Sequence, residues 1–183
     1  MRTLVTLLLA IVAAAPAMAQ NPTTDAIRQM VQGRAKNMPA AADLMPTDKY
    51  NFKPTPAQET FAHMQLHIVQ ANNTLCSAIG GTPAAEDKDL KETDGKDKIV
   101  AAMRRSFDMC TKALADLKDS DLAQEATVFG KKSSKGAALL TMASGWGDHY
   151  AAQAMYLRLN GILPPTAQKA ADNKDAKKKD DYK

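Results

Sequence analysis

Residues that favour β-strands are scarce in this chain of 183 residues: aromatic residues make up only 5% of it, and valine and isoleucine are few. This scarcity argues against a β-sandwich, whereas the many alanine, leucine, methionine and lysine residues favour helices. The length accommodates one domain of ordinary size. The hydrophobic and charged fractions, 45% and 24%, are near the globular average and exclude a wholly disordered chain.

Long apolar runs are missing except at the start of the chain, which excludes a protein with several membrane spans. Arg2 precedes an apolar run over 4–15, and the small residues of 17–19 form a cleavage site. This pattern predicts a secretory signal peptide over 1–19, so the mature chain would begin at Gln20. The run is shorter than the roughly 20 residues of a comfortable span, although an uncleaved anchor is the alternative. We expect a bacterial protein of the periplasm or the medium.

A strong basic surface is also missing from the part of the chain that can fold. The formal charge is +4, but the segment 168–183 alone holds six lysines and four aspartates. We expect this segment to be a disordered, solvated tail, with weak contact to anionic lipid as a lesser alternative. The remainder is close to neutral, which argues against a nucleic-acid partner.

Most catalytic motifs are absent. We find no phosphate-binding glycine loop, no paired-carboxylate motif and no Ser–His–Asp spacing, so neither a nucleotide nor this kind of hydrolysis is indicated. The chain also lacks C-x-x-C and C-x-x-C-H, which excludes a covalent haem and argues against a redox pair. The residues left to carry chemistry are three histidines and two cysteines.

Four segments have apolar residues at helical spacing, namely 24–45, 55–80, 93–117 and 135–160. No segment alternates as a strand does. Four helices of this length predict an all-α four-helix bundle over 20–167.

The second and third helices have recognisable start signals. Thr55 is a good N-cap, Pro56 suits the first helical position, and Gln58 would complete a capping box. Thr93 or Asp94 would cap the third helix. We expect 119–134 to be a loop.

All three histidines lie on expected helices. His63 and His67 are four residues apart and so share one helix face, while His149 lies on the inner stripe of the fourth helix. A neutral imidazole is a good ligand for zinc, nickel, copper or iron, and bundles hold metals between facing helices. A single histidine beside an apolar stripe is more often a core residue, and we interpret Trp146 and Tyr156 in the same way.

Several segments together resemble the DinB (DinB/YfiT-like) superfamily, over about 41–165. The second helix contributes HIVQANNTLCS, and KYNFKPTP stands just before it. The third helix contributes SFDMC, and the fourth contributes DHY followed by YLRLNGILPP. The matching segments are 49–56, 67–77, 106–110, 148–150 and 156–165.

The resemblance implies an up-down-down-up bundle in which many members bind a divalent metal through three histidines. Its characterised members include thiol-dependent transferases and isomerases. His67 matches the ligand from the second helix and His149 matches the last ligand from the fourth. The middle ligand falls at Gly145, which has no side chain to coordinate, and Ala151 replaces a family glycine. His63 is the remaining candidate for a third ligand.

Cys76 and Cys110 form an even pair in a chain expected to be exported, which suggests a disulfide; buried thiols are the alternative. The two cysteines are similarly far along their helices. If the second and third helices are parallel, the two lie near one level. If the helices are antiparallel, the cysteines lie roughly 20 Å apart and cannot bond.

Three functions are compatible with these features. The first is a metal-dependent enzyme of the hydrolase or transferase kind, using zinc, nickel or iron at His67, His149 and His63 with an unidentified small molecule. The second is a non-catalytic binding or structural bundle that lost the metal site at Gly145. The third is a periplasmic metal carrier. Homodimerisation through bundle faces is compatible with each of them.

Overall fold

The computed structural model describes residues 21–81 and 86–168. The expected signal peptide over 1–19 and the tail beyond 168 lie outside the described residues. Within the described ranges, none of the helices combines the length and the apolar character needed to cross a membrane.

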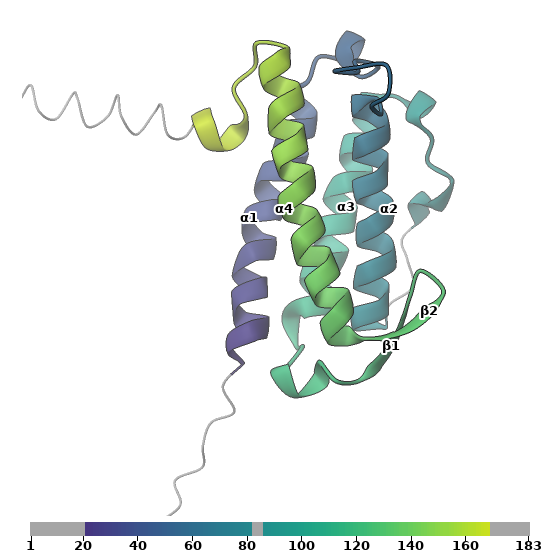
Figure 1. Cartoon of the computed structure of the whole chain (residues 1–183), viewed down its shortest axis with the longest axis vertical. Helices are drawn as coiled ribbons and strands as arrows, with labels where there is room; N and C mark the ends of the chain where they lie inside the picture. Colours follow the sequence, from purple (N-terminus) through teal and green to yellow (C-terminus); the bar gives the residue numbers. More distant parts are fainter. Residues whose placement is uncertain (1–20, 82–85, 169–183) are drawn as a thin grey trace, which may run out of the picture.

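Four helices form the body of the molecule and confirm the predicted all-α bundle. Figure 1 shows that α1 and α4 run in one direction and that α2 and α3 both run in the other, which is the up-down-down-up order. The helices are α1 (Pro22–Leu44), α2 (Phe61–Gly80), α3 (Lys96–Ala115) and α4 (Lys135–Leu159). The connections contain η1 (Thr47–Lys49), η2 (Glu86–Asp89), η3 (Glu92–Asp94), η4 (Asp119–Asp121), β1 (Glu125–Val128) and β2 (Lys131–Ser134).

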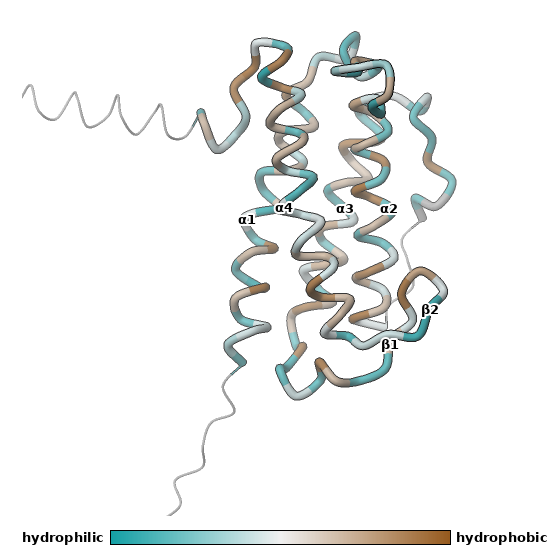
Figure 2. Tube along the Cα trace, in the orientation of Figure 1, coloured by the Kyte–Doolittle hydropathy of each residue, from teal (hydrophilic) through white to brown (hydrophobic). Residues whose placement is uncertain are grey.

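One continuous apolar core lies between the helices. Figure 2 shows hydrophobic residues recurring along each helix, while the connections at the ends are mostly hydrophilic. Phe61, Phe107, Met142 and Leu157 are almost completely inaccessible to solvent. Methionine fills much of this core, as its flexible side chain allows.

A buried disulfide joins α2 to α3 and confirms the predicted bond. Cys76 is the sixteenth residue of α2 and Cys110 the fifteenth of α3, and their Cα atoms are 5.0 Å apart. The two helices can place these residues at one level because they are parallel. Closing a loop with a sequence separation of 34 stabilises the fold by about 3–4 kcal/mol in the chain-entropy view.

Asn72 connects three helices through buried hydrogen bonds. Its side-chain oxygen accepts a 2.7 Å bond from the indole N–H of Trp146 on α4, and its amide donates to the hydroxyl of Ser106 on α3 at 3.1 Å. Such satisfied buried networks fix the register between helices. The indole of Trp146 is therefore held rigidly beside the α2–α4 interface.

The predicted start of the second helix is wrong. The helix begins at Phe61, and Thr60 is its N-cap, accepting a hydrogen bond from the His63 backbone N–H. The sequence from Thr55 to Gln58 instead forms an isolated turn, in which the Thr55 hydroxyl donates to the Gln58 side chain. That contact occupies the glutamine that a capping box would use.

The third helix likewise begins later than predicted, after Gly95, because Thr93 and Asp94 belong to η3.

The expected loop over 119–134 contains a β-hairpin, so the prediction that no strand is present is wrong. Strands β1 and β2 pair antiparallel from Glu125 opposite Ser134 to Val128 opposite Lys131. Each strand has only four residues, too few to show a periodic pattern. The turn at Phe129 and Gly130 has positive φ at both positions, the geometry that matches the twist of a two-residue hairpin.

Candidate functional site

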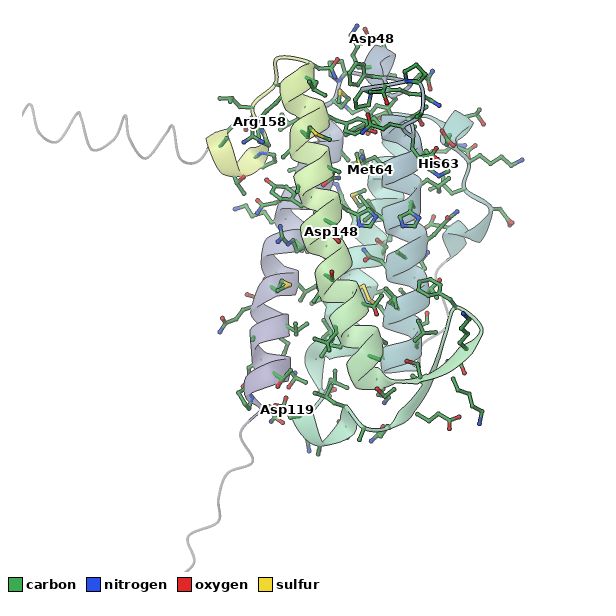
Figure 3. All side chains as sticks on the ribbon, viewed as in Figure 1. Asp48, His63, Met64, Asp119, Asp148 and Arg158 are labelled. Atoms are coloured by element: carbon green, nitrogen blue, oxygen red, sulfur yellow. A yellow bond between two sulfur atoms is a disulfide. The ribbon has the colours of Figure 1, made fainter. Side chains whose placement is uncertain are left out.

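An open groove of about 440 Å³ lies between α2 and α4. Figure 3 shows His63 and Met64 on α2 and Asp148 on neighbouring α4. Glu59 and His63 lie towards the start of α2, and His67 and His149 lie deeper along the two helices. The walls are mostly apolar and include Met64, Ala152, Met155 and Tyr156.

His67 and His149 meet across this groove. Their ring centroids are 5.0 Å apart and their planes differ by 20°, so the two imidazoles are stacked. Helices α2 and α4 are antiparallel neighbours. His67 lies in the first half of α2 and His149 in the second half of α4, so the two residues lie at the same level of the bundle. The sequence-based expectation that these two side chains lie together is met by this geometry.

His149 is held in one tautomer by the backbone of its own helix. Its Nδ1 lies 2.5 Å from the carbonyl oxygen of Gly145, one turn earlier. A carbonyl can only accept, so Nδ1 carries the proton and Nε2 carries the free lone pair. Backbone carbonyls commonly orient metal-binding histidines in this way.

The surroundings of His67 favour its neutral form. Burial lowers the pKa of its imidazole below the ordinary 6.5, and the neighbouring His149 and His63 lower it further. A neutral imidazole keeps one nitrogen lone pair available to a cation or a hydrogen-bond donor. His67 therefore favours the form of the imidazole that can bind a cation.

His63 faces a different partner. Its Nδ1 lies 2.7 Å from a carboxylate oxygen of Glu92, and the Thr60 hydroxyl donates to the other oxygen at 2.7 Å. The Thr60 hydrogen bond lowers the pKa of Glu92 against the opposing effect of burial, and His63 lowers it further. Glu92 engages only Nδ1 of His63, so a role as third ligand would fall to Nε2, and that role stays a prediction.

Gly145 occupies the remaining ligand position of the expected triad. A Cβ built there would lie 3.7 Å from Nδ1 and 3.9 Å from Cε1 of His149, which is ordinary contact. Packing therefore does not require glycine here. Within 21–81 and 86–168, no group of three or more His, Cys, Asp or Glu side chains is arranged to hold a metal. His67 and His149 fill two of the three ligand positions of the family, and Gly145 leaves the third without a ligand. The residues present therefore do not fit a complete three-histidine metal centre.

A small apolar cavity of about 20 Å³ continues from His149 towards the start of α4. Gly145 and Trp146 line it together with Ile68 of α2. Trp146 is 2% exposed and Tyr156 is 4% exposed, so both are buried as predicted. Tyr156 also lines the groove, and Trp146, the single tryptophan, lines the small cavity next to it and can report on binding nearby.

The sequence alone did not identify Glu59 and Glu92 as parts of this site. Glu59 is four residues before His63, and this spacing was a usable signal for a helical neighbour. Glu92 reaches His63 from η3, 29 residues further along the chain, and no local pattern predicts that contact.

Comparisons with known proteins agree with the geometry of the bundle. A family model described as the DinB superfamily matches residues 29–152. A solved DinB-like protein from Bacillus cereus ATCC 10987 is 20% identical, with a TM-score of 0.67, over 81% of this chain and 98% of that chain. A DinB-like protein from Bacillus subtilis is 18% identical, with a TM-score of 0.61, over 76% and 96%.

A mutant of a mycothiol-dependent maleylpyruvate isomerase is a more distant structural neighbour. It is 11% identical, with a TM-score of 0.53, over 69% of this chain and 58% of that chain. At these identities the three structures show a shared fold and do not transfer an activity. No curated protein matches the chain.

Proposed function

The chain belongs to the DinB superfamily, and from that premise we propose that it is an exported binding protein rather than an enzyme with a complete metal centre. Its groove holds a small ligand, and His67 with His149 holds a divalent cation weakly. One observation carries this proposal: two imidazoles are stacked across the groove while Gly145 stands at the third ligand position.

The chemistry of the donor set supports weak binding. Catalytic zinc sites generally use three protein ligands and leave one position open. The binding free energy of Zn²⁺ at a complete four-ligand site is roughly 10–16 kcal/mol. Half that number of ligands would give a binding free energy of roughly 5–8 kcal/mol, which corresponds to a Kd of roughly 1–200 µM. Such a site would be occupied only when the cation is abundant. We therefore assign no reaction step to a bound metal.

The residues of the groove have roles that do not depend on a cation. The Gly145 carbonyl keeps the His149 proton on Nδ1, so that Nε2 can accept from a ligand. The apolar walls formed by Met64, Met155 and Tyr156 favour a ligand with a hydrophobic part. These properties suit binding in a fixed orientation.

Two features support export. The sequence over 1–19 has the three-part pattern of a secretory signal peptide. The Cys76–Cys110 disulfide is of a kind that persists in oxidising compartments such as the bacterial periplasm. Detection of mature protein beginning at Gln20 in the periplasm or the medium would test this part of the proposal.

Calorimetric titration of the mature protein with Ni²⁺ and Zn²⁺ tests the cation site. We expect one ion per chain with micromolar or weaker affinity, lost in His67→Ala and in His149→Ala. His63→Ala is the matched control and should leave the affinity unchanged, because the proposed site uses only the stacked imidazoles of His67 and His149. A metal that co-purifies at one per chain and resists dialysis would contradict the proposal.

The metal-dependent enzyme is the second candidate, and one observation favours it. His63 lies one helical turn before His67 and lines the same groove. If His63 completes the centre through Nε2, His63→Ala should abolish metal binding, and Glu92→Gln should weaken it, because the carboxylate on Nδ1 orients the imidazole. Those two results together would favour an enzyme over a binding protein.

A further inference from the structure

The groove walls indicate a ligand with an apolar body. Met64 is buried, whereas Met155 is 44% exposed and presents its thioether to the groove. Tyr156 cannot offer its hydroxyl freely, because that group donates to the Glu59 carbonyl at 2.8 Å. The wall therefore contacts a ligand mainly through methionine side chains and an aromatic ring.

The charge of the groove is negative at one end. Among the described residues that line it, Glu59 is the only carboxylate, and none is a lysine or an arginine. Among the described residues that line the smaller cavity beyond His149, none is a lysine, an arginine, an aspartate or a glutamate. An organic acid placed here would lose hydration without meeting a lysine or arginine, which is costly.

Within 21–81 and 86–168, the charged group that the Glu59 carboxylate approaches most closely is still a distant one. His63 Nε2 lies 3.8 Å from that carboxylate, while His63 Nδ1 is 2.7 Å from Glu92. Any positive charge on His63 is therefore already balanced by Glu92. Among the described residues, Glu59 is left without a close ion pair at the mouth of an apolar groove.

We propose that the groove binds an organic amine: its ammonium group pairs with Glu59, and its apolar body lies against Met64, Met155 and Tyr156. This inference rests on the proposed binding function, since it names the class of ligand for the same groove. Glu59 and His67 are about two helical turns apart, roughly 10–12 Å, so the body would extend towards the histidine pair. The cation site and the amine site use different residues and can be tested separately.

Three linear probes of six carbons each differ in their head group: hexylamine, 1-hexanol and hexanoate. Binding is measured by calorimetry and by the fluorescence of Trp146, the single tryptophan. We expect hexylamine to bind about fivefold more tightly than 1-hexanol, the effect of one partly exposed ion pair. Hexanoate should bind more weakly than 1-hexanol. Equal affinities for the three probes, or no binding of any probe, would overturn the inference.

Glu59→Gln tests the proposed ammonium partner. This variant should lower hexylamine affinity to that of 1-hexanol and leave the 1-hexanol affinity unchanged. Glu125→Gln is the matched control, because Glu125 is equally exposed, at 68% against 67%, and lies in the hairpin away from the groove. Loss of amine preference in both variants, or in neither, would contradict the role of Glu59.

Failure of the amine site can be distinguished from failure of the cation site. Glu59→Gln should leave the Ni²⁺ titration unchanged, whereas His67→Ala should abolish it. Amine selectivity without Ni²⁺ binding would remove only the cation part of the proposed function. Ni²⁺ binding without amine selectivity would overturn only the present inference.

Discussion

Helix α2 packs tightly against α3 on one face and lines an open groove with α4 on another, and glycine has opposite roles on these two faces. At Gly80 a Cβ would lie 2.7 Å from the Cβ of Ala113, so the close approach of α2 and α3 requires glycine. At Gly145 a Cβ would make only ordinary contacts, with His149. The α2–α3 interface is closed by packing, while the α2–α4 face has a half-buried Gly145 beside the two histidines. The comparison separates the part of α2 that stabilises the bundle from the part that is available to a ligand.

The largest effect should come from the closed interface. Replacing both Cys76 and Cys110 by alanine removes the bond between α2 and α3, and we expect the free energy of unfolding to fall by about 3–4 kcal/mol. Urea denaturation followed by circular dichroism measures this loss. The Ni²⁺ affinity of the folded variant should be unchanged, and a parallel loss of Ni²⁺ binding would show that the two faces are not independent.

Alanine substitutions at the two glycines should have opposite signs. Gly80→Ala forces two helix backbones apart and should destabilise the protein by about 1–3 kcal/mol. Gly145→Ala removes a helix-interior glycine without a clash and should stabilise it by up to about 1 kcal/mol.

Gly147→Ala is the control for Gly145→Ala, because no atom lies within 4 Å of the position where its Cβ would be. It should stabilise α4 by the same propensity effect. Thermal unfolding of the three variants checks these signs. A destabilising Gly145→Ala would mean that the α2–α4 face is as closely packed as the α2–α3 face.

A smaller effect on stability comes from Glu92, which contacts His63 at the edge of the groove, and it depends on pH. The folded protein lowers the pKa of Glu92 from its ordinary 4.5, so the ionised form contributes stability above that pH. This contribution is lost as the pH falls through the lowered pKa in the folded state. Because Glu92 is partly exposed, we expect only about 0.5 kcal/mol. Glu92→Gln should flatten the stability profile below pH 5, as measured by urea denaturation at several pH values; an unchanged profile would contradict the contribution of this cluster.

The sequence was informative about the bundle because its helices are long. Stripes of apolar residues over twenty or more positions identify the inner faces, and parallel α2 and α3 place Cys76 and Cys110 together. These inferences depend on helix geometry, which a repeating pattern reveals. The resemblance to the DinB superfamily, rather than a periodic pattern, paired His67 with His149.

Features that depend on a single tertiary contact could not be read from the sequence. The α1 N-terminus is capped from another part of the chain, where the Asp119 carboxylate accepts from the Thr23 and Thr24 backbone N–H groups. The Glu92–His63 contact is of the same kind. The hairpin was missed because its two strands of four residues are defined by their turn and their pairing.

The central claim is that Gly145 is what leaves the cation site incomplete. Calorimetric Zn²⁺ titration of the mature protein and of Gly145→His tests it directly, since the variant places His at 145 and 149 on one face of α4 opposite His67. A third imidazole should contribute about 3 kcal/mol, so we predict that the variant binds one Zn²⁺ about a hundredfold more tightly than the natural protein. Equal affinities, with the natural protein already binding Zn²⁺ in the nanomolar range, would contradict the account.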